Sequence, residues 1–204
     1  MMFFSFKNAI FVSNNLELMM EIPTLKRLIS VEEYHKMGEY GILPEHGVEL
    51  INGEIIEMSP IGSLHSSRVN KLNALLAQIL GKSVIISIQN SVVLSNFSEP
   101  EPDIAILEYR ADYYATALPT AEDVKLIIEV AHSSFSYDRK VKLPLYAESG
   151  ISELWIINLE KEEIEIYWEP AGNNYRFREL LRPGDVLKAK GLNLELDVSE
   201  VLLC

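Results

Sequence analysis

The chain has 204 residues, of which 48% are apolar, which is enough for the hydrophobic core of one domain. Its single cysteine, Cys204, excludes an internal disulfide and any cysteine-based zinc site, and suits a reducing cytoplasm. The formal net charge of −12 argues against a simple nucleic-acid binder, whose surface would carry a basic patch. It does not exclude an enzyme acting on nucleic acid, because 18 Lys and Arg remain available to contact phosphates.

Residues 1–20 are predicted to be a disordered or mis-started extension, with Met19 or Met20 as the true initiator. Their apolar stretch, Ala9–Val12, is too short to span a membrane or to form the core of a signal peptide. We therefore expect no membrane association, and a single domain over residues 21–204.

Local signals predict the next elements. Ser30 and Glu33 have the spacing of a capping box, so a helix should begin there and continue to about Met37. Residues 48–58 predict a β-hairpin, because Asn52-Gly53 suits a type I′ turn between two apolar strands. Residues 63–80 carry apolar side chains at helical spacing and predict a long amphipathic helix.

The rest of the chain predicts strands with one more helix among them. The helix covers about 138–149, and Pro144 should either delay its regular part to about Val141 or kink it. Apolar or alternating runs predict strands at 83–88, 91–94, 103–107, 125–130, 154–158, 163–167 and 175–180. The order of elements indicates an α/β domain with a central mixed sheet flanked by helices.

Two acidic residues stand on strands that read as buried. Asp103 opens the run Asp103–Leu107, and Glu129 closes the run Lys125–Val130. A buried charge is costly unless it is paired, so these carboxylates either accept structural hydrogen bonds and ion pairs or bind one divalent cation together. The second alternative predicts a metal-dependent enzyme, most plausibly one that acts on phosphodiesters.

A Pro-Asp strand followed about 25 residues later by an acidic strand end resembles the PD-(D/E)XK nuclease superfamily. The segments 48–54, 101–103 and 126–157 narrow the match, and over about residues 30–203 the chain resembles the Uma-two family of restriction-endonuclease-like proteins. The resemblance implies a restriction-endonuclease-like core, with an added N-terminal hairpin and C-terminal β strands. It also implies a cytoplasmic, metal-dependent DNA endonuclease.

The resemblance further implies roles for individual residues. Asp103 and Glu129 would bind Mg²⁺, with Mn²⁺ as a substitute, and the backbone carbonyl of Val130 would add a third ligand. A metal-activated water would then hydrolyse the phosphodiester bond. DNA is the expected substrate, and a homodimer is expected because one site cuts one strand of a duplex.

The superfamily's lysine should stand two residues after the second acid, where this chain has Ala131. The Uma-two family carries a lysine on the following helix instead, and Lys142 matches it, four residues after Asp138 and four before Tyr146. Lys142 would then stabilise charge at the reacting phosphate. Two alternatives stay open: Lys140 is the competing lysine, and Lys142 is an ordinary i, i+4 partner of Asp138.

The remaining candidates have weaker signals. Glu49 matches an acidic residue of the family's hairpin and is either a third catalytic carboxylate or part of a cross-strand charge pair. His65 occupies a position where the family often has histidine, but a hydrogen-bonding role at the helix start is favoured. His132 replaces an expected Ser or Asp near Glu129. Tyr146 and Trp155 are expected to pack in the core.

Two other functions remain open. The first is a catalytically inactive, nuclease-fold binding module, which Ala131, His132 and the acidic net charge favour. The second is a nuclease that acts on RNA or on branched DNA, since the same residues would serve either substrate.

Overall fold

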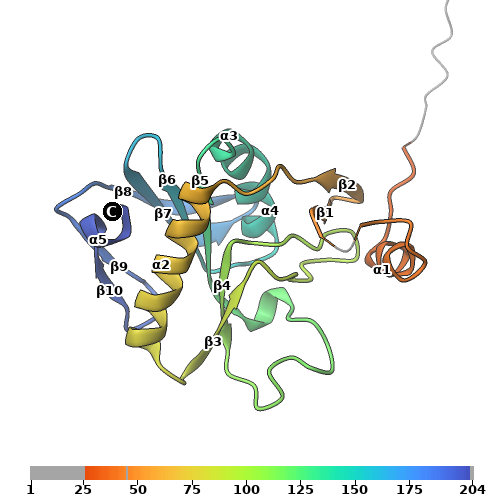
Figure 1. The fold of residues 1–204 in the computed structure, drawn as a ribbon, viewed down its shortest axis with the longest axis horizontal. Helices are drawn as coiled ribbons and strands as arrows, with labels where there is room; N and C mark the ends of the chain where they lie inside the picture. Colours follow the sequence, from red (N-terminus) through yellow and green to blue (C-terminus); the bar gives the residue numbers. More distant parts are fainter. Residues whose placement is uncertain (1–25, 45, 203–204) are drawn as a thin grey trace, which may run out of the picture.

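A computed structural model describes residues 26–44 and 46–202. Its centre is a six-stranded mixed sheet in the order β3-β4-β5-β6-β7-β8, in which β5 and β6 are parallel and all other neighbours are antiparallel (Figure 1). The strands are β3 (Val84–Ile88), β4 (Ile104–Glu108), β5 (Val124–Ala131), β6 (Glu153–Asn158), β7 (Glu163–Ala171) and β8 (Asn174–Leu181). This architecture confirms the predicted fold class, whereas the predicted extension over residues 1–20 lies outside the described residues.

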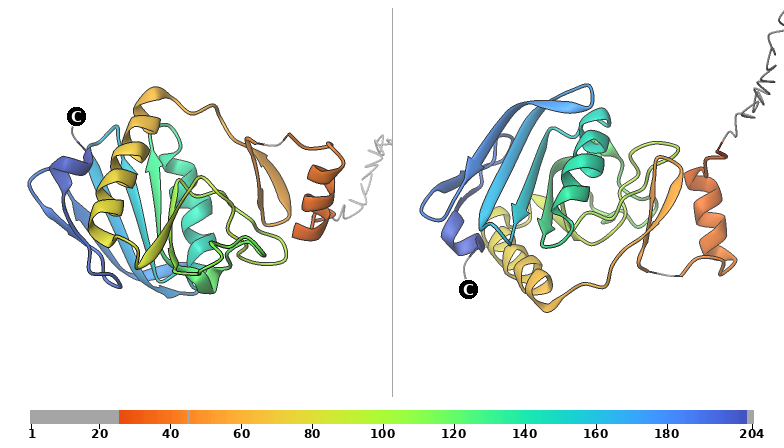
Figure 2. Two further views of the ribbon diagram at one scale, coloured as in Figure 1. Left: turned by 60° about the horizontal axis from the view of Figure 1, so that its bottom comes forward. Right: turned by 90° about the horizontal axis from the view of Figure 1, so that it is seen from above.

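The two faces of the sheet are covered by different helices (Figure 2). On one face lies α2 (Ser63–Leu80), and on the other lies α4 (Leu143–Glu148). Because side chains alternate along a strand, Ile128 and Val130 of β5 pack in the core under α2, whereas Ile127 packs under α4. Ile127, Glu129 and Ala131 of β5 therefore face α4.

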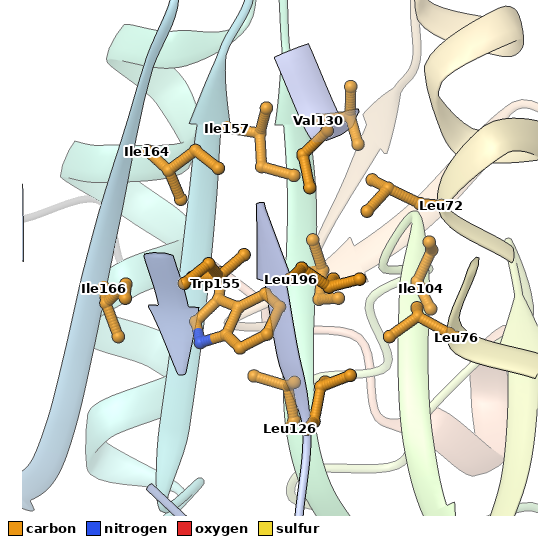
Figure 3. Packing of buried hydrophobic residues seen from close by; sticks show 14 of the residues in the cluster. Leu72, Leu76, Ile104, Leu126, Val130, Trp155, Ile157, Ile164, Ile166 and Leu196 are labelled. Atoms are coloured by element: carbon orange, nitrogen blue, oxygen red, sulfur yellow. The ribbon is translucent and has the colours of Figure 1, made fainter. Parts of the chain in front are cut away.

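The larger core lies between α2 and the sheet (Figure 3). Leu72 and Leu76 of α2 are fully buried at helical spacing, and Trp155 of β6 is fully buried among them. The end of the chain closes this core with β9 (Val186–Lys188), β10 (Glu195–Asp197) and α5 (Val198–Leu202). The predicted burial of Trp155 is thus confirmed.

The N-terminal elements form a separate layer at the end of the sheet away from β9 and β10 (Figures 1 and 2). The predicted capping box begins α1 (Val31–Glu39), and the predicted hairpin consists of β1 (Val48–Ile51) and β2 (Glu54–Glu57). Both turn residues have positive φ, 50° at Asn52 and 76° at Gly53. The hairpin is fixed by paired backbone hydrogen bonds between Leu50 and Glu99.

Two local predictions differ from the structure. Residues 91–94 do not form a strand, because their N–H groups bond alternately to two different segments, at Ser98 and Pro100 and at Pro119. The helix predicted over 138–149 consists of a short turn α3 (Phe135–Tyr137), a π-helical segment η2 (Asp138–Lys142) and α4. A 3₁₀ turn, η1 (Ala121–Asp123), precedes β5.

The wide turn of η2 accommodates Pro144. A proline in a regular helix lacks the N–H donor and its ring clashes with the carbonyl four residues earlier. Here the preceding Leu143 N–H reaches back five residues to the Asp138 carbonyl, as in a π turn. The predicted disturbance at Pro144 therefore occurs as a widened turn, which ends at Lys142.

Within residues 26–44 and 46–202, no helix has both the length and the apolarity needed to cross a membrane.

Candidate active site

Pairing of β4 with β5 brings Asp103 and Glu129 together. The antiparallel register pairs Ile104 with Ile128, so the next residues outward are Asp103 and Glu129. The Asp103 N–H donates to Glu129 Oε2 at 3.4 Å, and the Val130 N–H donates to Asp103 Oδ2 at 2.8 Å. The predicted adjacency of the two acidic strands is confirmed.

Lys142 reaches the same point from the helical side. Its Nζ lies 3.3 Å from Glu129 Oε1 and 3.3 Å from Glu49 Oε2, and its side chain is only 8% exposed. Lys140, the competing lysine, is exposed to solvent. Asp138 is buried nearby and accepts a hydrogen bond from Ser134 Oγ at 2.8 Å. The close ion pairs of Lys142 are therefore with Glu49 and Glu129, and not with its i, i+4 neighbour Asp138.

The hairpin contributes Glu49 to this cluster. Glu49 is almost fully buried, and its Oε2 also accepts the Glu101 N–H at 3.3 Å. Its other oxygen lies 3.4 Å from the hydroxyl of Tyr137, which donates to it. The side chain of Glu49 is thus directed from β1 to the lysine, and β2 offers it no charge partner at Ile56, the residue that pairs with it.

Further polar side chains hold the two acids. The Tyr146 hydroxyl donates to Glu129 Oε1 at 2.6 Å, so this core residue also orients a carboxylate. His65 Nε2 lies 3.0 Å from Asp103 Oδ2, near the start of α2, and Gln89 donates to Asp103 Oδ1 at 3.3 Å. His132, at the end of β5, is exposed.

The electrostatics of the cluster follow from burial and from an excess of acids. Burial raises the pKa of Glu129 to about 8, although Lys142 opposes the shift. Burial likewise raises the pKa of Asp138 to about 6. For Lys142, burial lowers the pKa, but Glu129 and Glu49 outweigh it, and the pKa is raised above its usual range. Lys142 therefore stays charged. At the other acid, the hydrogen bond between His65 and Asp103 raises the pKa of His65.

The donor set fits a hard divalent cation. Asp103 and Glu129 offer carboxylate oxygens from neighbouring strands, and Mg²⁺ is commonly held by one or two carboxylates together with substrate phosphates. The Val130 carbonyl should point to the same strand edge as its N–H, which bonds to Asp103. Among the described residues no three acidic, His or Cys side chains converge as a ready-made metal cage. The residues therefore fit an ion that takes only some of its ligands from the protein.

Some residues of the site had no clear signal in the sequence. Tyr137 and Gln89 reach Glu49 and Asp103 only because the hairpin and the turn after β3 fold onto the sheet edge. Asp138 was recognised in the spacing pattern with Lys142, but its burial follows from the π-helical turn.

Comparison with known proteins agrees with this architecture. The profile of the Uma2 family, described as "Putative restriction endonuclease", matches residues 31–199. A solved structure, "a putative nuclease belonging to DUF820" from Anabaena variabilis, is similar with a TM-score of 0.68 and 16% identity, covering 85% of this chain and 97% of that one. No curated protein sequence matches the chain. The family match covers most of the sequence, so the chain belongs to the Uma2 family of putative restriction endonucleases and has their restriction-endonuclease-like fold.

Proposed function

We propose that the protein is a Mg²⁺-dependent DNA endonuclease in which Asp103, Glu129 and Lys142 form the catalytic centre. One observation carries the proposal. The Lys142 ammonium lies 3.3 Å from Glu129, whose carboxylate is joined by a hydrogen bond to the backbone of Asp103. Two neighbouring acids can hold a metal ion that activates water, and a buried charged lysine can stabilise charge on a phosphate, so this arrangement supports metal-assisted phosphodiester hydrolysis.

Each residue has a defined task. Asp103 and Glu129, with the Val130 carbonyl, would hold Mg²⁺, or Mn²⁺ in its place. When bound, the ion would activate the attacking water and stabilise charge developing on the phosphate. Lys142 stays charged among its acidic neighbours and would stabilise the same charge. Glu49 fixes the position of the lysine.

The family description supports DNA as the substrate. We further propose a homodimer, because each site would cut one strand and a two-fold pair of sites suits a duplex. RNA or branched DNA are the alternative substrates for the same centre.

A second function, that of a non-catalytic module with a nuclease fold, is favoured by one feature. Lys142 is neutralised by two buried carboxylates, which would also stabilise the fold without any chemistry. In that case the cluster is structural and binds no divalent ion.

Nicking of supercoiled plasmid DNA tests the proposal. The wild-type protein should nick in Mg²⁺ or Mn²⁺ and stop in EDTA. Asp103→Asn should lower the rate by about 100-fold or more, because the ion that activates the water and stabilises the phosphate charge would lose a ligand. Asp112→Asn is the matched control, because Asp112 pairs with Arg110 in a different loop. Silence of the wild type on plasmid, RNA and branched DNA, with no Mn²⁺ binding by calorimetry, would favour the non-catalytic module.

A further inference from the structure

A second polar site lies on the other side of η2 from Lys142. A pocket of about 270 Å³ is lined by the guanidinium side chains of Arg139, Arg176 and Arg178. In a chain with a net charge of −12, three arginines around one pocket form an unusually basic spot. Planar guanidiniums in this number are typical of sites that recognise phosphate.

The arginines are held in place by the sheet. Arg178 of β8 lies opposite Tyr167 of β7, which packs in the core under α4, so Arg178 projects on the same face of the sheet as Glu129. It pairs with Glu165, whose side chain is only 2% exposed, and Arg139 Nε lies 3.6 Å from the same carboxylate. One buried carboxylate thus orients two guanidinium groups. Because it neutralises only one of their two charges, the pocket keeps a net positive charge.

Tyr175 gives an independent indication of a missing partner. It lines the same pocket, its side chain is buried, and its hydroxyl has no hydrogen-bond partner among the described residues. Buried hydroxyls are usually paired, so this one is an unsatisfied donor in a residue that lines the pocket, although the oxygen itself is covered from solvent. The volume lies below the roughly 300–1,000 Å³ of clefts that bury drug-sized ligands, which suits a phosphate with part of its sugar.

The pocket stands at a useful distance from the catalytic centre. Glu129 of β5 pairs with Ile156 of β6, which in turn pairs with Glu165 of β7. Two strand spacings separate the acids, which is about 10 Å at roughly 4.8 Å per spacing. That places the pocket within a few phosphates of the catalytic centre along one strand of a duplex, whose phosphates wind around the axis and so lie farther apart than their axial rise of about 3.4 Å.

We propose that Arg139, Arg176 and Arg178 form a phosphate clamp that binds the backbone of the nucleic-acid strand within a few nucleotides of the bond to be cut. The inference rests on the proposed function, because the strand in the clamp is the substrate of the neighbouring centre. The clamp binds without regard to base sequence, since its contacts are to phosphate. At this pocket, the positive charge of the arginines offsets the repulsion between an acidic protein and the polyanionic nucleic acid.

Binding to a fluorescein-labelled 20-base-pair duplex, followed by anisotropy in EDTA, tests the clamp without relying on catalysis. Arg176→Gln should weaken binding about eightfold at 0.1 M salt, because each phosphate contact contributes a factor close to the −0.9 power of salt concentration. The slope of log affinity against log salt should become less steep by about one. Adding Arg139→Gln should reduce the slope again.

Arg182→Gln is the matched control. Arg182 follows β8 directly, is 64% exposed against 68% for Arg176, and pairs with Glu163 as Arg176 pairs with Glu169, but it does not line the pocket. Its replacement should leave affinity and salt slope close to those of the wild type. Equal losses in Arg176→Gln and Arg182→Gln would overturn the clamp, and so would a wild type that does not bind the duplex.

The two proposals fail in different ways. If binding depends on the arginines but the protein never cleaves nucleic acid, the clamp proposal stands and the nuclease proposal is contradicted. Asp103-dependent cleavage with binding unaffected by Arg176→Gln and Arg139→Gln would keep the nuclease and contradict the clamp. Displacement of the duplex by inorganic phosphate at matched ionic strength, with no change of salt slope in the variants, would assign the pocket to free phosphate and also overturn the clamp.

Discussion

Glu129 shows how a buried carboxylate is kept in this fold. Lys142 and Tyr146 both contact its Oε1, and the Asp103 N–H contacts its Oε2. A charge removed from water needs such partners, because desolvation of an unpaired carboxylate costs several kcal/mol. The partners come from Asp103, directly before β4, and from η2 and α4, so Glu129 links the end of β5 to the helix that carries the lysine.

Tyr146→Phe should therefore destabilise the protein. The phenyl ring fills the same buried space, but Glu129 loses its shortest hydrogen bond, 2.6 Å from the Tyr146 hydroxyl. The expected loss in free energy of unfolding is about 1–3 kcal/mol, the usual cost of leaving a buried polar group unsatisfied. Urea denaturation measures it, with Tyr40→Phe as the control because Tyr40 is 80% exposed. An unchanged midpoint for Tyr146→Phe would contradict this role.

Among the elements, η2 decides which lysine enters the site. The resemblance to the family favours Lys142 over Lys140, and in the structure Lys142 is buried among carboxylates whereas Lys140 is exposed. A regular helix would have led us to expect an ion pair with Asp138 four residues earlier. The π turn before Pro144 changes that register, and the lysine pairs with Glu49 and Glu129 instead.

The β1–β2 hairpin is the element that carries Glu49 to Lys142, and its turn depends on Gly53. Gly53 has φ of 76°, and a Cβ atom there would lie 2.6 Å from the Leu28 Cβ. Gly53→Ala should therefore lower the free energy of unfolding by about 1–3 kcal/mol through backbone strain and steric clash. Gly38→Ala in α1 is the control, since nothing lies within 4 Å of its added Cβ and alanine favours a helix. Equal urea midpoints for the two variants would refute the argument.

The elements also show what could be predicted from sequence. The hairpin and the α1 capping box depend on residues a few positions apart, so local patterns indicated them. The contact of Glu49 with Lys142 joins residues far apart in the chain, and it forms only because Leu50 pairs with Glu99. The resemblance to a family suggested Glu49, but no local rule could supply its partner. The contacts of Tyr137 with Glu49 and of Gln89 with Asp103 likewise join segments far apart in the chain.

On the scale of the whole molecule, charge is distributed unevenly. Four carboxylates, those of Glu49, Asp103, Glu129 and Asp138, gather around Lys142 in a chain that is already strongly acidic. In the proposed function, this negative charge would draw in a divalent cation, and without the cation it would repel a nucleic acid. The arginine pocket beyond η2 provides attraction for phosphate on the same face of the sheet.

Divalent metal should consequently stabilise the folded protein. A ligand that binds only the folded state at 100 times its dissociation constant adds about 2.7 kcal/mol, which for a chain of this size corresponds to a rise of roughly 5–10 °C in Tm. Mn²⁺ should give this rise by calorimetry, whereas NaCl at equal ionic strength should not. Asp103→Asn should remove most of the effect and Asp112→Asn should keep it. A rise of the same size in Asp103→Asn would mean that the metal binds elsewhere.

In the proposed site, Lys142 supplies the charge that Ala131 cannot, and this charge would make the chain a working nuclease. The most direct measurement is the rate of Mg²⁺-dependent plasmid nicking by the wild type, Lys142→Gln and Lys140→Gln, with circular dichroism to verify that each variant is folded. We predict nicking by the wild type, a loss of about 100-fold or more for Lys142→Gln, and a nearly unchanged rate for Lys140→Gln. A silent wild type, or a folded Lys142→Gln protein that nicks as fast as the wild type, would contradict the account.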